Sequence, residues 1–253
     1  MLNRNLAESI AHRISAKLPP EDIADQVPDF DTAYAMQYAV ALIIQENTGG
    51  IAGYKIAWNN AAQIAELSPN APAVGHIFDD QVQQSGVQFP VGTFRQLAVE
   101  PEIIAVIGQD IHGSGQTEET VLPLIAGFHA GFEVMDRREA SPTLLTHPPS
   151  IVANNIFNNG LVIGENRAAT VDFSAIETVV HKDGKEILRA MNAAPQHPVL
   201  AVATVANILA KRGKVLRAGD KVLCGTHMPP FVVESGTLRV TMGVLGDAEF
   251  SYG

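Results

Sequence analysis

The chain has 253 residues, of which 46% are hydrophobic and 17% charged, so it can bury a substantial core as one large domain or as a main domain with a smaller partner. Its formal net charge of -10 argues against a nucleic-acid or acidic-membrane surface, since both need clustered Lys and Arg. The N-terminal segment carries charges where a signal peptide needs an apolar core, no apolar stretch is long enough to cross a bilayer, and the single cysteine, Cys224, excludes an internal disulfide framework. We therefore expect a cytoplasmic protein that acts on a small ligand or a metal.

Two helices are predicted in the first fifty residues. An apolar residue at every fourth position from Leu6 to Leu18 indicates one helix, which ends at Pro19. Asp31 or Thr32 can cap a second helix, which stops at the Gly-Gly step that follows it. The first fifty residues therefore form a helical arm.

From residue 51 the pattern changes to short β-rich runs. The predicted strands cover residues 51–58, 98–108, 130–135, 161–164, 171–181, 185–191, 221–224 and 237–245. Shorter helices are predicted at residues 60–67, 118–126 and 198–212, and the Asp183-Gly184 step predicts a hairpin. The fold class is therefore α+β, with mixed or antiparallel strands, and no glycine-rich phosphate-binding motif supports a nucleotide-binding architecture.

Three acids in two apolar runs indicate a candidate metal centre. Glu100 and Glu102 are alternate residues of a predicted strand, so they point to one face, roughly 6 to 7 Å apart, and Glu133 lies in a second apolar run. Carboxylates without a counter-charge are costly to desolvate, and an oxygen-only set favours a hard ion such as Mg2+ over zinc. The alternative is a solvated strand edge, where Pro101 would fit because it has no N–H.

Several short motifs follow one another in a distinctive order. They are GYKI at 53–56, GHIFDD at 75–80, VEPEI at 99–103, GFEVMDRR at 131–138, LRAGD at 216–220 and VLCGT at 222–226. This ordered set resembles the 2-oxopent-4-enoate hydratase and 4-oxalocrotonate decarboxylase branch of the fumarylacetoacetate hydrolase superfamily, over residues 30 to 250.

The resemblance implies a curled, mixed β-sheet core with a helical N-terminal part, and a homo-oligomer. It also implies a small-molecule 2-oxo acid substrate and Mg2+ or Mn2+ held by the acids Glu100, Glu102 and Glu133. We accordingly divide the chain into residues 1–68, the helical part with the first strand, and residues 69–253, the β-rich catalytic core.

Two further residues receive catalytic roles from the resemblance. Lys55 is expected to transfer a proton, and burial beside a metal would lower its pKa. The alternative is a lysine whose stem lies on the sheet and whose head is in water. Asp80 is expected near the pocket as an orienting or proton-handling carboxylate, or else as a turn cap.

The expected substrate-binding residues are Asn155, Phe157 and Thr226. Where the family usually shows Ala-Asp-Asn-Ala-Ser, this chain reads ANNIF at 153–157, so Phe157 replaces a hydroxyl group with an apolar ring and Asn154 replaces a carboxylate. Where the family shows Leu-Thr-Gly-Ser, the chain reads LCGT, and Thr226 keeps a hydroxyl. The wall that faces the substrate therefore differs from the usual pattern.

Together these residues predict a metal-dependent lyase of aromatic catabolism, a hydratase that adds water to a 2-hydroxy-2,4-dienoate to give a 4-hydroxy-2-oxo acid. One alternative is a decarboxylase of a 2-oxo-enedioate, whose second carboxylate would pair with Arg95, Arg137 or Arg138. Another is a catalytically altered binding or complex-forming subunit of the same fold. Hydrolysis of a C–C bond is disfavoured, because no His-Glu pair of the kind used by the hydrolases of the superfamily is found.

Overall fold

The structure is a computed structural model that describes residues 3–68 and 71–253. Its helices are α1 (Arg4–Ser15), α2 (Phe30–Thr48), α3 (Ala61–Leu67), α4 (Glu118–Val121), α5 (Pro142–Leu145), α6 (Pro148–Ala153) and α7 (Pro198–Ala210). Its strands are β1 (Ile51–Ala57), β2 (Ala73–Phe78), β3 (Val82–Gln84), β4 (Val87–Phe89), β5 (Leu97–Ile107), β6 (Ile125–Asp136), β7 (Asn158–Ile163), β8 (Glu177–Lys182), β9 (Lys185–Met191), β10 (Lys221–Thr226), β11 (Phe231–Val232), β12 (Gly236–Thr241) and β13 (Asp247–Tyr252).

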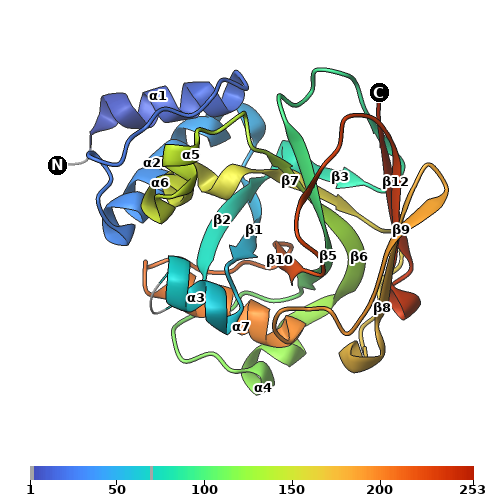
Figure 1. Cartoon of the computed structure of the whole chain (residues 1–253). Coiled ribbons are helices and arrows are strands. Elements are labelled where there is room, and N and C mark those ends of the chain that lie inside the picture. Colours follow the sequence, from blue (N-terminus) through green and yellow to red (C-terminus); the bar gives the residue numbers. More distant parts are fainter. Residues whose placement is uncertain (1–2, 69–70) are drawn as a thin grey trace.

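The strands form two mixed sheets (Figure 1). The larger has the order β2-β1-β10-β5-β6-β7-β3, with β11 paired to β5, and the smaller has the order β4-β13-β12-β8-β9. Most neighbours are antiparallel, while β1 with β10, β3 with β7 and β4 with β13 are parallel. The α+β class with curled, mixed sheets is therefore confirmed.

The main hydrophobic core joins the two sheets and α7. Phe132 of β6 meets Phe250 of β13 edge to face, with ring centroids 5.3 Å apart, so the contact connects one sheet to the other. Val202 and Val205 of α7 are fully buried, and the helix packs against β10, β1 and β5. This packing fixes the strands that carry the candidate site.

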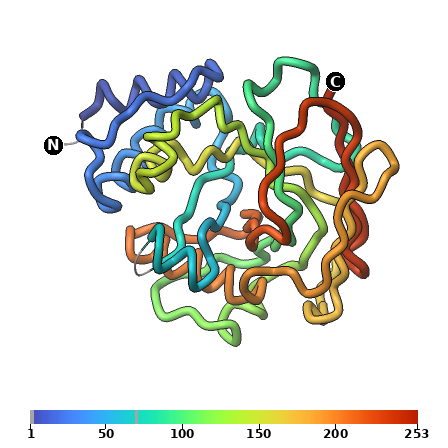
Figure 2. Tube along the Cα trace, in the orientation of Figure 1, coloured from blue at the N-terminus to red at the C-terminus, as the bar shows by residue number. Residues whose placement is uncertain are grey.

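A second cluster holds the helical part together. Ile10 of α1, Met36 of α2 and Val152 of α6 are buried in it, with Phe78 of β2. Figure 2 shows the blue chain of α1 and α2 beside the yellow-green segment that contains α5 and α6, far away in sequence. The predicted helical N-terminal part is confirmed, whereas the division at residue 68 stays a prediction, since β1 itself lies between β2 and β10.

Several sequence predictions differ from the structure in their bounds. The cap of α2 is Asp29, whose carboxylate accepts from the Thr32 N–H at 2.7 Å, so the predicted cap was wrong. The predicted helix at residues 118–126 was also too long, because α4 ends at Val121 and β6 begins at Ile125. The hairpin at Asp183 is confirmed by the pairing of β8 with β9.

Five paired strands were not predicted at all: β2, β3, β4, β11 and β13. All six residues of β2 are buried, so the strand lacks the alternation of apolar and polar residues that marks a half-exposed strand. Across residues 3–68 and 71–253 there is no helix long and apolar enough to cross a membrane.

Candidate metal centre and its cavity

The three predicted acids converge on one side of the larger sheet. Glu100 of β5 and Glu133 of β6 are opposite each other in the antiparallel pair, and Glu102 is the next residue of β5 that faces the same way. Each carboxylate offers an oxygen within 4.8 Å of those of the other two. Glu102 and Glu133 are 1% and 0% exposed, so the alternative of a solvated strand edge is wrong.

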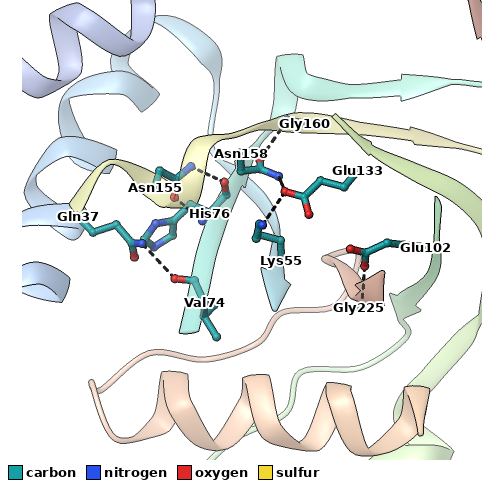
Figure 3. A network of polar contacts seen from close by, with 10 residues as sticks. All are labelled: Gln37, Lys55, Val74, His76, Glu102, Glu133, Asn155, Asn158, Gly160 and Gly225. Atoms are coloured by element: carbon teal, nitrogen blue, oxygen red, sulfur yellow. Dashed lines mark hydrogen bonds and ion pairs between the residues drawn. The ribbon is translucent and has the colours of Figure 1, made fainter. Parts of the chain in front are cut away.

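Lys55 reaches this cluster from a strand that is not adjacent to it. The strands β10 and β5 lie between β1 and β6, which in a flat sheet would place β1 and β6 roughly 14 Å apart. The Nζ of Lys55 nevertheless lies 2.9 Å from Oε1 of Glu133 (Figure 3). The sheet therefore curls so that these side chains meet on its concave side.

Each of the two most buried carboxylates has one oxygen held by the protein. Oε1 of Glu133 accepts from Lys55 and from Nδ2 of Asn158 at 3.0 Å, and Oε2 of Glu102 accepts from the N–H of Gly225 at 2.6 Å (Figure 3). The other oxygens, Oε1 of Glu102 and Oε2 of Glu133, are buried and have no hydrogen-bond partner within the described part of the chain. Since an unpaired buried acceptor is costly, this donor set fits a hard divalent cation.

The contact between Glu102 and Gly225 depends on glycine. The φ of Gly225 is +110°, and a Cβ there would lie 2.6 Å from Nδ2 of Asn59 and 2.7 Å from Cγ of Pro195. Any other residue would be strained and would collide with these neighbours. The LCGT segment thus places a backbone donor on a buried carboxylate.

The ionisable groups of the cluster shift one another's pKa values. Burial and the neighbouring Glu133 raise the pKa of Glu100 to about 8, and the same causes raise the pKa of Glu102. Burial lowers the pKa of Lys55, but the three carboxylates outweigh it and the pKa is raised. The expected lowering of the Lys55 pKa refers to a site that holds a metal, so it stays a prediction; without metal, Lys55 is the counter-charge of the acids.

A cavity of about 550 Å³ opens beside the carboxylates. Lys55, Glu100 and Glu102 line its polar end, while Ile156 and Phe157 form part of an apolar wall. The cavity therefore has the volume and the mixed lining of a site for a small organic molecule.

The three arginines considered for a second carboxylate are in different surroundings. Arg137 lines the cavity. Arg95 pairs with Glu139 at the surface, and Arg138 is buried and donates to Oδ1 of Asn154. Arg137 is thus the one whose position suits a ligand in this cavity.

The predicted substrate-binding residues do not all face the cavity. Phe157 and Thr226 line it, although the Thr226 hydroxyl donates to the carbonyl of Met228. Asn155 instead clamps the β2 backbone, since its Oδ1 accepts from the N–H of His76 at 2.7 Å and its Nδ2 donates to the carbonyl of the same residue at 2.8 Å. Asn155 therefore supports the wall without forming part of it.

Asp80 lies away from the carboxylates. It belongs to a short 3-10 turn, Asp79–Gln81, and lines another cavity together with Lys17 and Phe89. Burial raises its pKa, while the charge of Lys17 acts in the opposite direction. The structure does not bring Asp80 to Lys55 or to the acids.

The segment that carries Phe157 has an unusual backbone. Asn155, Ile156 and Phe157 have φ values of 57°, 51° and 57°, and consecutive left-handed residues are strained, the more so for a β-branched side chain. The clamp of Asn155 on His76 is one contact that holds this turn. Such strain is concentrated at functional sites.

Sequence reasoning missed three residues here, Asn158, Gly225 and His227. Asn158 fixes Glu133 and also accepts from the N–H of Gly160 at 3.1 Å, and the Asn-Asn-Gly step is a weak signal for such a turn. His227 lines the cavity, with Nδ1 2.6 Å from Oγ1 of Thr178. The position of His227 directly after the LCGT motif was the available signal.

No family model matches the chain, but known proteins are similar to it over most of its length. A 4-oxalocrotonate decarboxylase of Pseudomonas sp is 23% identical over 240 residues, which are 94% of this chain and 93% of that protein. A 2-keto-4-pentenoate hydratase of Burkholderia vietnamiensis is 27% identical over 228 residues, 88% of this chain and 86% of that protein.

Solved structures show the same fold. The 4-oxalocrotonate decarboxylase from Pseudomonas putida G7, complexed with magnesium and adipate, has a TM-score of 0.88 at 24% identity and covers 99% of this chain and 97% of its own. A fumarylpyruvate hydrolase from Pseudomonas aeruginosa, in complex with Mn2+ and pyruvate, has a TM-score of 0.58 at 18% identity and covers 79% of this chain and 88% of its own.

Proposed function

We propose that this chain, which belongs to the 2-keto-4-pentenoate hydratase and 4-oxalocrotonate decarboxylase branch of the fumarylacetoacetate hydrolase superfamily, is a metal-dependent lyase acting on a small 2-oxo acid or its enol. Its first candidate reaction is the addition of water to a 2-hydroxy-2,4-dienoate to give a 4-hydroxy-2-oxo acid. The observation that carries this proposal is the pair of unpartnered carboxylate oxygens, on Glu102 and Glu133, beside Lys55.

Glu100, Glu102 and Glu133 would hold Mg2+ or Mn2+, in agreement with the metals in the two structural neighbours described above. Bound there, such an ion supplies a Lewis acid for the negative charge that reaches the C2 oxygen of a 2-oxo acid. Asn158 holds one oxygen of Glu133 in place, and the N–H of Gly225 holds one oxygen of Glu102. The carboxylates therefore need not reorganise when the site is filled.

Lys55 is proposed to move the proton in the reaction. It lines the cavity, where Nζ can give a proton to C5 of the dienol while the 2-hydroxyl gives up its own proton, which restores the charge on the lysine. Water then adds to the resulting enone, with its OH on C4 and its H on C3. Phe157 and Thr226 are proposed to contact the substrate, and the apolar wall packs against its hydrocarbon part. Asn155 positions that wall, and Asp80 is assigned no step.

A decarboxylase of a 2-oxo-enedioate is the second candidate. It is favoured by Arg137, which lines the cavity and forms no ion pair with the carboxylates of the described residues. A guanidinium there can pair with the second carboxylate of such a substrate.

The test is to incubate the purified protein and Mg2+ with 2-hydroxypenta-2,4-dienoate, and separately with 4-oxalocrotonate, while following the diene absorbance. Product mass distinguishes gain of water from loss of CO2. We expect turnover of the dienoate that stops with chelator and returns with Mg2+. Absence of turnover of both substrates by metal-loaded protein would contradict the lyase assignment and favour a catalytically altered subunit.

Two finer properties complete the proposal. We propose a homo-oligomer, as the family resemblance implies, and a cytoplasmic location, supported by the single buried cysteine, Cys224. Light scattering on the purified protein tests the oligomer, and an experiment on cell fractions tests the location.

A further inference from the structure

A second cavity of about 550 Å³ lies behind the metal centre. Its walls come from α2, β2 and the C-terminal end of α7, and they include Tyr34, Gln37, Tyr38, His76, Arg212 and Lys214. Gly75 pairs with Lys55, and the next residue, His76, faces the opposite side of β2. Figure 3 shows His76 and Gln37 on one side of this strand and Lys55 with Glu133 on the other.

The lining of this cavity is positive, in a chain whose net charge is -10. Lys211, Arg212 and Lys214 contribute to it, against one acid, Asp31. No ion pair links any of these three cations to a carboxylate of residues 3–68 or 71–253. A local excess of unneutralised positive charge at a cavity attracts anions.

Aromatic rings hold two of these cations in place. The guanidinium of Arg212 lies 3.7 Å from the ring centroid of Tyr34, and Nζ of Lys214 lies 3.4 Å from that of Tyr38. Cation–π contacts of this kind position a cation but leave its full charge available to a ligand.

A simpler explanation covers only part of this cluster. Basic residues commonly complement the C-terminus of a helix, and Arg212 does donate to the carbonyl of Ile208 at 3.1 Å. Lys214, however, lies beyond the end of α7 at Ala210 and contacts α2. Its charge also adds to the effect of burial in lowering the pKa of His76 to about 4, so Lys214 acts across the cavity on a neutral imidazole.

Much of the rest of the lining is apolar or aromatic. Val74, Ile208 and Leu209 join the two tyrosine rings, so an occupant that satisfies the whole cavity needs an apolar body as well as a negative group. We propose that this cavity is a second binding site, for a small organic carboxylate with an apolar body, and that its occupancy is coupled to the wall of the metal cavity.

The proposed coupling follows hydrogen bonds that connect the wall of one cavity to the wall of the other. Gln37 donates to the carbonyls of Val74 at 3.1 Å and of Val152 at 2.9 Å, and Asn155 holds both backbone polar groups of His76. Gln37 and His76 line the second cavity, whereas the segment that they hold continues to Phe157 in the metal cavity. A ligand that shifts Gln37 or His76 therefore acts on the strained left-handed turn, whose Ile156 and Phe157 line the metal cavity.

The binding test uses benzoate as the probe and isothermal titration as the readout, with Mg2+ and oxalate present to fill the metal cavity. We expect one benzoate per chain, bound at least 10-fold more weakly by the Arg212→Met/Lys214→Met variant and unchanged in the matched control Arg4→Met/Lys185→Met, which removes two exposed cations elsewhere. Lys214→Met alone should give an intermediate loss, and thermal unfolding verifies that each variant is folded. Equal benzoate affinity in the double variant and the wild type would overturn the site.

Two further measurements bear on the ligand class and on the coupling. Inorganic phosphate should bind at least 10-fold more weakly than benzoate, and equal binding would overturn the requirement for an apolar body. Saturating benzoate should change the affinity of the Mg2+-loaded wild type for 2-oxopentanoate at least 3-fold. The same benzoate concentration should leave that affinity unchanged in the Arg212→Met/Lys214→Met variant. An unchanged affinity in the wild type would overturn the coupling, and the benzoate titration does not depend on whether the protein is a lyase.

Discussion

Lys55 and Glu133 form a fully buried ion pair, with Nζ 2.9 Å from Oε1, although two other strands separate β1 from β6 in the sheet. The pair exists because the sheet curls, and it supplies one positive charge to a cluster of three carboxylates. Without a divalent ion, the remaining negative charge is limited by protons on Glu100 and Glu102, whose pKa values are raised.

Replacement of Lys55 by Met should reduce turnover at least 100-fold and spare metal binding, because Lys55 is proposed to carry the proton and is not a ligand. Without metal, the variant should lose about 3 kcal/mol of stability, since breaking one side of a buried ion pair leaves an uncompensated charge. Thermal unfolding with and without Mg2+ measures this loss. Lys185→Met, at an exposed position, is the control, and an unchanged rate for Lys55→Met would contradict the role of the lysine.

Asn158 is predicted to tune metal affinity through Glu133, to which it donates at 3.0 Å. Asn158→Leu should weaken Mn2+ binding about 10- to 100-fold, as is typical when a partner of a metal ligand is removed. Titration of Mn2+ measures the effect, and Asn5→Leu on the exposed face of α1 is the control. Equal affinity in the two variants would show that Asn158 only fills space.

Two glycines provide a matched pair for the contact with Glu102. Gly225→Ala brings a Cβ within 2.7 Å of two neighbours and should displace the N–H donor. Gly213 has a φ of +67° and open space around it, so Gly213→Ala should lose only the stability that a left-handed alanine costs, about 1 kcal/mol. We expect Gly225→Ala to lose more stability than Gly213→Ala and also to bind Mn2+ more weakly. Similar effects of the two substitutions on unfolding and on Mn2+ titration would refute the contact.

The stability of the metal-free protein should fall as pH rises. Burial and neighbouring charge raise the pKa of Glu100 from 4.5 to about 8, so the folded state binds more protons than the unfolded state between these values and loses stability as pH rises through them. Metal affinity should rise over the same window, because binding releases protons. Thermal unfolding in chelator across this range measures the slope, which should be shallower in Glu100→Gln, and an equal slope in that variant would contradict the shifted pKa.

The sequence predicted the acidic cluster better than its surroundings. Glu100 and Glu102 could be placed on one face because a strand alternates every second residue, and the ordered motifs placed Glu133 and Lys55 with them. The raised pKa of Lys55 without metal depends on contacts across four strands, which local pattern does not contain.

Other features that the sequence did not reveal also come from long-range register and backbone. Gly225 meets Glu102 only because β10 pairs with β5, 123 residues away in sequence. Asn155 turned away from the cavity because a left-handed turn, for which Ile156 and Phe157 have little intrinsic preference, directs its amide to β2. Asp80 was expected beside the cavity from its motif, but the 3-10 turn carries it to another one.

The most direct test of the metal centre is titration of Mn2+ into the wild type and the Glu102→Gln variant. Glutamine keeps the shape and removes the charge, so the variant should fold normally, bind Mn2+ at least 100-fold more weakly and show no metal-dependent turnover. Glu46→Gln, on the exposed face of α2, is the matched control. One tightly bound ion per wild-type chain that is lost in Glu102→Gln is the predicted result, and equal Mn2+ affinity in the two proteins would contradict the account.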